Sequence, residues 1–405
     1  MYWPNFIHIY QPPTQNREIV EKVAIECYRP MVRILLEHPN GKLTLNINAC
    51  LTEQLWRYGF SDVIDCLGEL AERGQIEFTG SAKFHPILPL IPEKEVTRQV
   101  RLNEDGNRRF FEDLYQPRGF FPPEMCYSRG LAEIVKGLGY SWIIVDELSF
   151  NGKLGQVRTD TLYEIHDLKG FMVYFKERRV SAGITYGRCK DLAEFKEFIK
   201  GELQMGGYLL SGTDGEVYGH HRPGQERLLE QAFKDPDIRA CRISDLEHLF
   251  PKREVVDPLP SSWSTWEDEM EEGVPYPQWD YPGNELHRLQ WELARLAIEA
   301  VHETDPSIKG WSEARTLLDE GLHSCQWWWA SCRPWWDTGM INLGAQVLFK
   351  SISAIGNETL IERAKALVME IQEKSREWHE SGRARELKEQ YMEAHRDVTS
   401  LLSFG

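Results

Sequence analysis

The chain has 405 residues, a length typical of two or three domains or of an α/β barrel with an added domain. Hydrophobic residues make up 41% and charged residues 27%, which provides for a sizeable core and excludes wholesale disorder. The formal net charge is −16. Such a field repels phosphate groups, so it argues against a nucleic-acid or anionic-membrane partner.

Apolar runs and cysteines indicate the compartment. No apolar stretch approaches the ~18 residues of a membrane span, and no basic segment followed by an apolar run opens the sequence. The eight cysteines include no Cys-x-x-Cys pair, so neither a zinc ribbon nor a redox pair is indicated. We therefore expect reduced thiols in a cytoplasmic protein that does not associate with membranes.

Residues 1–250 alternate between strand-like and helix-like segments. In chain order, strands are predicted at residues 5–10, 43–47, 76–78, 120–121, 141–145, 171–175 and 208–210. Helical spacing is found between them, around residues 63–70 and 93–114. This alternation predicts a parallel sheet, closed or open, which would form a catalytic domain over residues 1–250.

The rest of the chain differs in composition. Residues 251–284 are rich in proline and tryptophan, which predicts an ordered, irregular crossing segment between domains. Residues 285–405 are predicted to form a helical C-terminal domain, in which 285–302 is amphipathic and 361–396 is long, highly charged and free of proline.

Acidic side chains are predicted to follow several strands. Glu77, Glu124, Asp146 and Asp214 each stand at or just beyond a strand-like segment, as does His8. The C-terminal rim of a parallel barrel is where catalytic residues are found. Several carboxylates from different strands therefore predict a site at that rim.

Two segments contribute the strongest candidates. In Gly-Phe-Phe-Pro-Pro-Glu, two prolines restrict the backbone in front of Glu124 and present its carboxylate rigidly. In Ser-Gly-Thr-Asp-Gly-Glu-Val-Tyr-Gly-His, glycines allow tight turns around Asp214 and Glu216. Glu124 alone is compatible with a helix-start carboxylate, and Asp-Gly alone with a simple turn. Together, two acids on one rim fit glycoside hydrolysis.

These residues resemble the motifs of glycoside hydrolase family 57. Gln11 and Pro12 match the family's His-Gln-Pro with Tyr10 in place of histidine, and His8 matches an additional upstream histidine. Further matches, in chain order, are Gly-Gln-Ile-Glu77, Phe121-Pro-Pro-Glu124 with phenylalanine for the usual tryptophan, and Thr-Asp214-Gly-Glu-Val-Tyr-Gly-His220. A variable fifth motif is placed at residues 321–331.

The resemblance implies an incomplete (β/α)7 barrel followed by a helical domain, an α-glucan substrate and a retaining mechanism without cofactor or catalytic metal. Glu124 would be the nucleophile and Asp214 the general acid/base. Residues predicted to contact the sugar are His8, Gln11, Glu77, His85, Phe121, Asp146, Glu216, His220, His323 and Trp328. Trp328 belongs to a cluster of five tryptophans at residues 327–336, for which we expect at least one ring to stack on a sugar.

Other functions remain open on the sequence. An amylase-like hydrolase, a 4-α-glucanotransferase and a branching enzyme differ in whether water or a sugar hydroxyl resolves the intermediate. A metal-dependent polysaccharide deacetylase needs an aspartate and two histidines around the ion, and no His-x-x-x-His spacing supports one. A non-catalytic sugar-binding protein is compatible with Tyr10 and Phe121, but the presence of both acids speaks against it.

Overall fold

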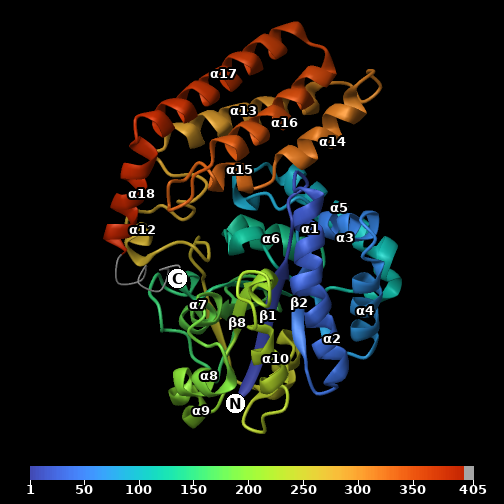
Figure 1. Cartoon of the computed structure of the whole chain (residues 1–405), viewed down its shortest axis with the longest axis vertical. Helices are drawn as coiled ribbons and strands as arrows, with labels where there is room; N and C mark the ends of the chain where they lie inside the picture. Colours follow the sequence, from blue (N-terminus) through green and yellow to red (C-terminus); the bar gives the residue numbers. More distant parts are fainter. Residues whose placement is uncertain (396–405) are drawn as a thin grey trace. The chain divides into compact units, whose positions relative to one another are not determined.

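The structure is a computed structural model that describes residues 1–395. The chain divides into two compact units (Figure 1). Within the described residues, the first unit comprises Met1–Lys83 and Leu88–Trp263, and the second comprises Phe84–Ile87 and residues 264–395.

The first unit is built on a sheet that contains ten strands within the described residues. Nine strands form a continuous path in the order β10-β6-β7-β5-β4-β3-β2-β1-β8, and β9 pairs with β1. All neighbours are parallel except β6 and β7. The strands are β1 (Tyr2–Ile9), β2 (Leu43–Ile47), β3 (Ile76–Gly80), β4 (Gly119–Phe120), β5 (Trp142–Asp146), β6 (Leu162–Ile165), β7 (Met172–Lys176), β8 (Ser211–Asp214), β9 (Arg239–Cys241) and β10 (Arg253–Val256).

The sheet curls into an incomplete barrel. Its β8 edge approaches β7, where the backbone N–H of Glu177 donates to the carbonyl of Leu210 at 2.8 Å. β6 and β10 extend the sheet beyond β7 and take no part in this closure. The predicted fold class, an incomplete α/β barrel followed by a helical region, is confirmed.

Alternation of side chains along the strands creates two cores. In β2, Leu43, Leu45 and Ile47 face the core that lies between the sheet and the helices outside it. The opposite, inner face carries Phe6 of β1 and Trp142 of β5, which belong to a second core inside the curl. Along each of these strands, every second residue counted from Phe6 or Trp142 therefore points into the barrel. Where the strands end, these inward-pointing residues form the rim of the barrel.

Helical crossovers connect the parallel strands, as their geometry requires. Figure 1 shows α1 to α4 along one flank of the sheet. The helices of the first unit, with the short 3-10 and π segments written as η, are α1 (Arg17–Val23), η1 (Ala24–Tyr28), α2 (Arg29–Glu37), α3 (Ala49–Arg57), α4 (Ser61–Glu72), η2 (Leu88–Leu90), α5 (Glu93–Phe111), η3 (Glu112–Leu114), η4 (Pro123–Met125), α6 (Arg129–Gly137), η5 (Glu147–Ser149), α7 (Arg178–Thr185), α8 (Leu192–Phe198), α9 (Lys200–Met205), η6 (Gly215–Val217), α10 (Glu226–Ala232), η7 (Ile243–Asp245) and α11 (Leu246–Leu249).

The second unit is helical. Its helix α16 packs against α13, α14 and α17, and Figure 1 shows the four side by side. Asn284 begins α13 by accepting hydrogen bonds from two backbone N–H groups of the first turn. The helices are α12 (Glu267–Glu271), α13 (Glu285–Glu303), α14 (Trp311–Gly321), α15 (Cys325–Trp328), α16 (Thr338–Ile355), α17 (Glu358–Glu380) and α18 (Arg383–Ala394).

Two details differ from the sequence predictions. The strand predicted at 208–210 lies at Ser211–Asp214, because the earlier residues make only an isolated bridge to Tyr2. The long helical segment expected over 361–396 is divided into two helices, since Gly382 adopts a left-handed conformation (φ 79°) and separates α17 from α18. Arg396, its predicted last residue, lies outside the described residues.

The sequence predicted reduced thiols and no segment long and apolar enough to span a membrane. All eight cysteines are free, and six of them are buried. None of the helices within residues 1–395 has the length and apolar character needed to cross a membrane.

Candidate active site

The inner face of the sheet delivers polar side chains to the rim where β1, β2 and β8 end side by side. His8 is level with Asn46 on one side and with Asp214 on the other. All three have the parity that points into the barrel, since Phe6, two residues before His8, lies in the inner core. The sequence rule that polar residues at strand ends meet on one rim therefore holds for His8 and Asp214.

His8 is buried in a neutral hydrogen-bonded row. Its Nδ1 lies 2.8 Å from Asn46 Oδ1, and Asn46 Nδ2 donates to Thr79 Oγ1 at 3.2 Å. Because an amide oxygen only accepts, Nδ1 carries the proton. Burial lowers the pKa of His8 to about 4, against the opposing effect of the Asn46 hydrogen bond, so the ring is neutral near pH 7. Its ring lies 4.6 Å from that of Phe121, which is fully buried.

Asp214, the last residue of β8, is half-buried. Burial raises the pKa of its carboxyl to about 6, and the nearby Lys176 ammonium opposes this rise. A carboxyl with this pKa is partly protonated under mildly acidic to neutral conditions. It can therefore donate a proton and later accept one, which is the exchange that a general acid/base performs.

Glu124 is presented in a conformation that non-glycine residues seldom adopt. It lies in η4 with φ 59° and ψ 17°, and the next residue, Met125, is also left-handed. Such backbone strain, about 1–3 kcal/mol, persists only where the surroundings enforce it. Here the Trp263 indole N–H donates to Glu124 Oε2 at 2.8 Å, and the Trp263 backbone N–H donates to the Glu124 carbonyl at 3.2 Å. The half-buried carboxyl is thus held in one orientation.

Glu216 lies two residues after Asp214 but turns away into the protein. It is buried and accepts hydrogen bonds from the Tyr28 hydroxyl and from Gln11 Nε2, the latter at 3.1 Å. Burial, together with the charge of Asp214, raises the pKa of Glu216 to about 7. Gln11, which is buried too, is thereby fixed beneath the rim on the same side as Glu216.

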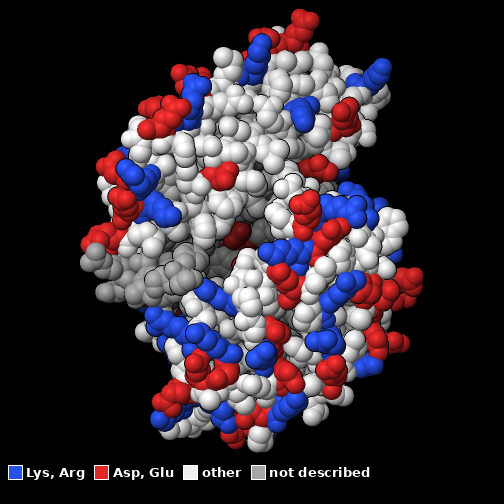
Figure 2. All heavy atoms as spheres, viewed as in Figure 1, with Lys and Arg blue, Asp and Glu red and all other residues white. Residues whose placement is uncertain are grey.

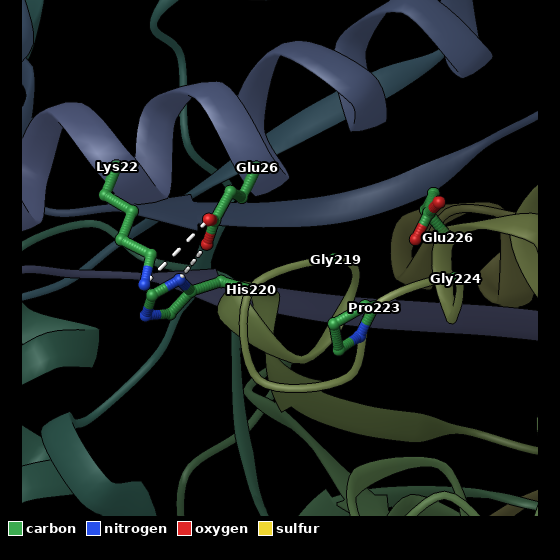
Figure 3. Close-up of a pocket in the computed structure, with 7 residues that line it drawn as sticks. All are labelled: Lys22, Glu26, Gly219, His220, Pro223, Gly224 and Glu226. Atoms are coloured by element: carbon green, nitrogen blue, oxygen red, sulfur yellow. Dashed lines mark hydrogen bonds and ion pairs between the residues drawn. The ribbon is translucent and has the colours of Figure 1, made fainter.

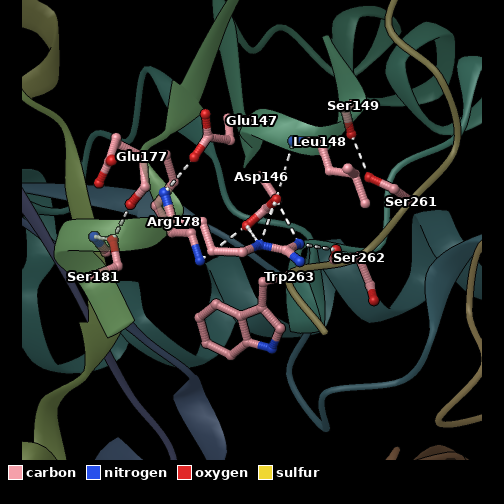
Figure 4. Close-up of polar contacts among 12 residues, drawn as sticks. Asp146, Glu147, Leu148, Ser149, Glu177, Arg178, Ser181, Ser261, Ser262 and Trp263 are labelled. Carbon is pink, nitrogen blue, oxygen red and sulfur yellow. Dashed lines mark hydrogen bonds and ion pairs between the residues drawn. The ribbon is translucent and has the colours of Figure 1, made fainter. Parts of the chain in front are cut away.

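Asp146 ends β5 and is fully occupied by cations (Figure 4). Arg178 donates to both of its carboxylate oxygens, at 2.6 Å and 3.2 Å, and Lys176 Nζ lies 3.0 Å from Oδ2. Burial favours the protonated acid, but Arg178 and Lys176 prevail and hold the pKa of Asp146 below its ordinary value. Its backbone neighbour Leu148 donates a further hydrogen bond to it. Asp146 therefore acts in the structure as an ion-pair and capping residue.

Glu77 does not lie where the sequence placed it. It is the second residue of β3, not at or beyond the end of the strand, and this part of the prediction is wrong. Glu77 accepts hydrogen bonds from Thr44 Oγ1 at 2.8 Å and from the Ser244 backbone at 3.0 Å. Those partners occupy it inside the barrel, below the level of His8.

His220 lies beside the outer helices. Its Nδ1 is 2.7 Å from Glu26 Oε2 in η1, and Lys22 Nζ is 4.0 Å from the other oxygen of that carboxylate. Figure 3 shows these residues around an open hollow of about 360 Å³. The structure thus pairs His220 with Glu26, and its contact with a sugar stays a prediction.

The remaining predicted residues belong to the second unit. His85 Nδ1 lies 3.0 Å from Ser324 Oγ, and the Ser324 backbone N–H donates to the His85 carbonyl. His323 is 1% exposed, and neither ring nitrogen finds a hydrogen-bond partner among residues 1–395. Burial lowers the pKa of His323 to about 4. Their role in the site stays a prediction.

The tryptophan cluster contains both core and partly accessible rings. Trp327 is fully buried and stacks on Trp291, with ring centroids 4.2 Å apart. Trp328 is half-buried and stacks on Trp335 at 4.5 Å. Trp327 is therefore a packing residue, and Trp328 keeps an accessible surface.

Sequence reasoning missed two residues that organise the rim. Lys176 ends β7, and the rule that selected the acids at strand ends would have found it if cations had been included. Trp263 reaches Glu124 from a segment far away in the chain, and no local pattern announces that contact.

The surface carries charges of both signs (Figure 2), and the described residues include no cluster of metal-binding side chains. Figure 2 shows acidic and basic side chains intermingled on the viewed face, without a large patch of one sign. Within residues 1–395, no group of three or more His, Cys, Asp or Glu side chains is arranged to hold a metal ion.

Comparisons with known proteins agree with the fold described above. The sequence model of glycosyl hydrolase family 57 matches residues 5–257. An alpha-amylase of Pyrococcus horikoshii is 29% identical over 144 residues, which cover 36% of this chain and 22% of that protein. The chain thus spans about a fifth of the length of such relatives.

Solved structures share the fold at low sequence identity. The 4-alpha-glucanotransferase of Thermococcus litoralis is 18% identical, with a TM-score of 0.67 over 87% of this chain and 59% of that one. A branching enzyme of Pyrococcus horikoshii is 16% identical, with a TM-score of 0.63 over 93% of this chain and 95% of that one.

Proposed function

Because the chain belongs to glycosyl hydrolase family 57, we propose that it is an α-glucan-active enzyme that works by a retaining mechanism, with Glu124 as nucleophile and Asp214 as general acid/base. The observation that carries this proposal is the state of the two acids. Both are half-buried, Glu124 is held in a left-handed conformation, and the pKa of Asp214 is raised to about 6. The relatives' amylase and glucanotransferase activities support the choice of substrate.

The first half of the reaction forms a glycosyl-enzyme. A Glu124 oxygen attacks the anomeric carbon while the bond from that carbon to the leaving oxygen breaks, and Asp214 gives its proton to the leaving oxygen. In the second half, Asp214 takes a proton from an incoming hydroxyl group, and the oxygen of that group displaces Glu124. Two inversions at the carbon give net retention.

The neighbouring residues suit this chemistry. His8 is neutral and hydrogen-bonded to Asn46, so it adds no charge that would compete with Asp214 for the proton. The Trp263 indole N–H donates to Glu124 Oε2 and holds the carboxyl in one orientation for attack. The eight free thiols support the expected reducing cytoplasm as the compartment.

Activity on defined maltooligosaccharides tests the proposal. We expect wild-type protein to release products whose anomeric proton, followed by NMR in the first minutes, has the α configuration. Glu124→Gln is expected to lose ~10⁴-fold or more in turnover, because an amide cannot form the glycosyl ester. Its circular dichroism and melting temperature should match those of the wild type. Products of β configuration, or an active Glu124→Gln protein, would remove the retaining assignment.

Chain lengths of the products distinguish hydrolysis from transfer. If water resolves the glycosyl-enzyme, all products are shorter than the substrate. Products longer than the substrate identify a glucanotransferase, and new α-1,6 linkages identify a branching enzyme. No turnover on any α-glucan, by protein with native circular dichroism, would contradict the proposed substrate class.

A further inference from the structure

Two buried cations share the carboxylate of Asp146, and the buried Glu147 carboxyl accepts a hydrogen bond from the Arg178 backbone N–H. The two cations at Asp146 are Lys176 and Arg178, whose side chains are 6% and 8% exposed. Arg178 already engages both carboxylate oxygens and also donates to the Ser262 carbonyl. A buried ammonium is costly unless it is compensated. Lys176 is therefore a second buried cation on a carboxylate that Arg178 already engages, and its charge can also act on another nearby acid.

The path of the Lys176 stem shows which other acid lies near it. Lys176 crosses the seam of the barrel from β7 to β8 and packs on the backbone of Gly212. A Cβ built on Gly212 would lie 3.0 Å from Lys176 Cγ, 3.1 Å from its Cδ and 3.4 Å from Met125 Cε. Gly212 is two residues before Asp214 and has the same inward parity, and Met125 directly follows Glu124. The stem thus runs between the two candidate catalytic segments.

The end of the side chain lies against the residue that orients Glu124. Lys176 Nζ is 5.6 Å from the centroid of the Trp263 ring, within the range of a cation–π contact. The indole N–H of the same ring donates to Glu124 Oε2. One buried ammonium is therefore flanked by Asp146, by the ring that positions Glu124 and by the strand that ends in Asp214.

We propose that Lys176 is a positioning residue of the reacting pair, whose fixed positive charge sets how readily Asp214 releases and regains its proton. This inference rests on the roles proposed above for Glu124 and Asp214. Without the ammonium, a partly buried Asp214 would hold its proton too strongly to act as a base in the second half of the reaction. When the ammonium is present, Arg178 also neutralises the charge of Asp146. The positive charge of Lys176 can therefore act on Asp214 as well.

The other ionisable groups around Asp214 are acidic or neutral, so Lys176 is the cation among them. Glu216, on the following turn, is an acid and makes the ionised form of Asp214 less favourable. Tyr186, the residue that follows α7, is neutral, because burial raises its pKa to about 12. His8, level with Asp214 in the sheet, is neutral as well. Only Lys176 therefore attracts the ionised carboxylate among these groups.

The test is the pH profile of kcat/KM for maltooligosaccharide cleavage in Lys176→Met, a change that keeps the apolar stem and removes the charge. The first step needs protonated Asp214, so the alkaline limb reports its pKa. Removing a neighbouring cation raises that pKa, and we expect the limb to move up by roughly one pH unit. Lys196→Met is the matched control, because it removes a lysine that pairs with Asp235 and Asp237 away from the rim. Its limb should not move.

A second measurement keeps the inference separable from the proposed function. The protein is labelled with 13C at the aspartate carboxyl carbons, and Asp214→Asn identifies the Asp214 signal. Its titration midpoint should rise in Lys176→Met whether or not any glucan is cleaved. An unchanged midpoint overturns the inference, including the case in which Lys176→Met only lowers the melting temperature. A shifted midpoint in a protein that cleaves no α-glucan upholds the charge coupling and overturns the proposed function.

Discussion

Two aspartates stand at corresponding places on the rim, one at the end of β5 and one at the end of β8, and they differ in almost every other respect. Asp146 is fully buried and is held by Arg178, Lys176 and a backbone N–H. Asp214 is half-buried and makes no recorded hydrogen bond or ion pair within residues 1–395.

The difference is chemical. A carboxylate that is already neutralised by two cations stays ionised and cannot exchange protons near pH 7, whereas one that is shielded without a direct partner can do so. Position at a strand end therefore identifies candidates, and the surroundings separate the structural acid from the catalytic one.

The largest effect, a loss of activity, is expected at Asp214, the aspartate without a direct ion-pair partner. Asp214→Asn should reduce kcat/KM on maltooligosaccharides by ~10²–10⁴-fold, because the amide can neither donate nor accept the catalytic proton. Its melting temperature should stay close to that of the wild type, since no ion pair is lost. Steady-state kinetics and thermal unfolding measure the two quantities. A strong loss of stability with little loss of activity would show that the two aspartates do not differ in this way.

A loss of stability is expected instead at Asp146, the aspartate that pairs with two buried cations. Asp146→Asn leaves two buried cations without their shared anion, which should lower the free energy of unfolding by ~3–5 kcal/mol. Urea unfolding measures the change. Asp160→Asn is the control, because Asp160 pairs with Arg158 on the surface and its loss should change little. If both variants unfold alike, the buried cations do not depend on Asp146.

A smaller effect extends the same contrast to two neighbouring tryptophans of the second unit. Trp328→Ala should weaken glucan binding by roughly tenfold, about 1.4 kcal/mol, while its melting temperature changes little. Trp327→Ala should mainly lower stability, because Trp327 is fully buried on Trp291. Affinity by isothermal titration and melting temperature are compared for the two variants. Proportional losses of both quantities in Trp328→Ala would assign that ring to the core.

The sequence allowed the architecture and the reactive acids to be proposed, for identifiable reasons. Strands such as β2 carry apolar and polar side chains in strict alternation, which reveals both faces of the sheet. β6 and β10 escaped prediction, because they are short strands at the open end of the sheet. Gly382 ended a helix inside a charged segment whose periodicity continued through it.

The surroundings of the acids could not be predicted in the same way. Which oxygen of Glu124 receives a hydrogen bond depends on Trp263, whose position follows from tertiary packing. The left-handed backbone of Glu124 is likewise not implied by two preceding prolines, which restrict the chain before it and not the residue itself. Proton affinity depends on such contacts, so it becomes visible only in three dimensions.

The absent side chain at position 212 has a consequence for how this sequence can change. A Cβ at this position would lie 3.0 Å from Lys176 Cγ, so any residue larger than glycine there would press on the stem of Lys176 and require it to shift. A shorter residue at 176 would remove that restriction and allow a side chain at 212. Across descendants of this sequence, we therefore expect the two positions to vary jointly, with glycine kept wherever the lysine is kept.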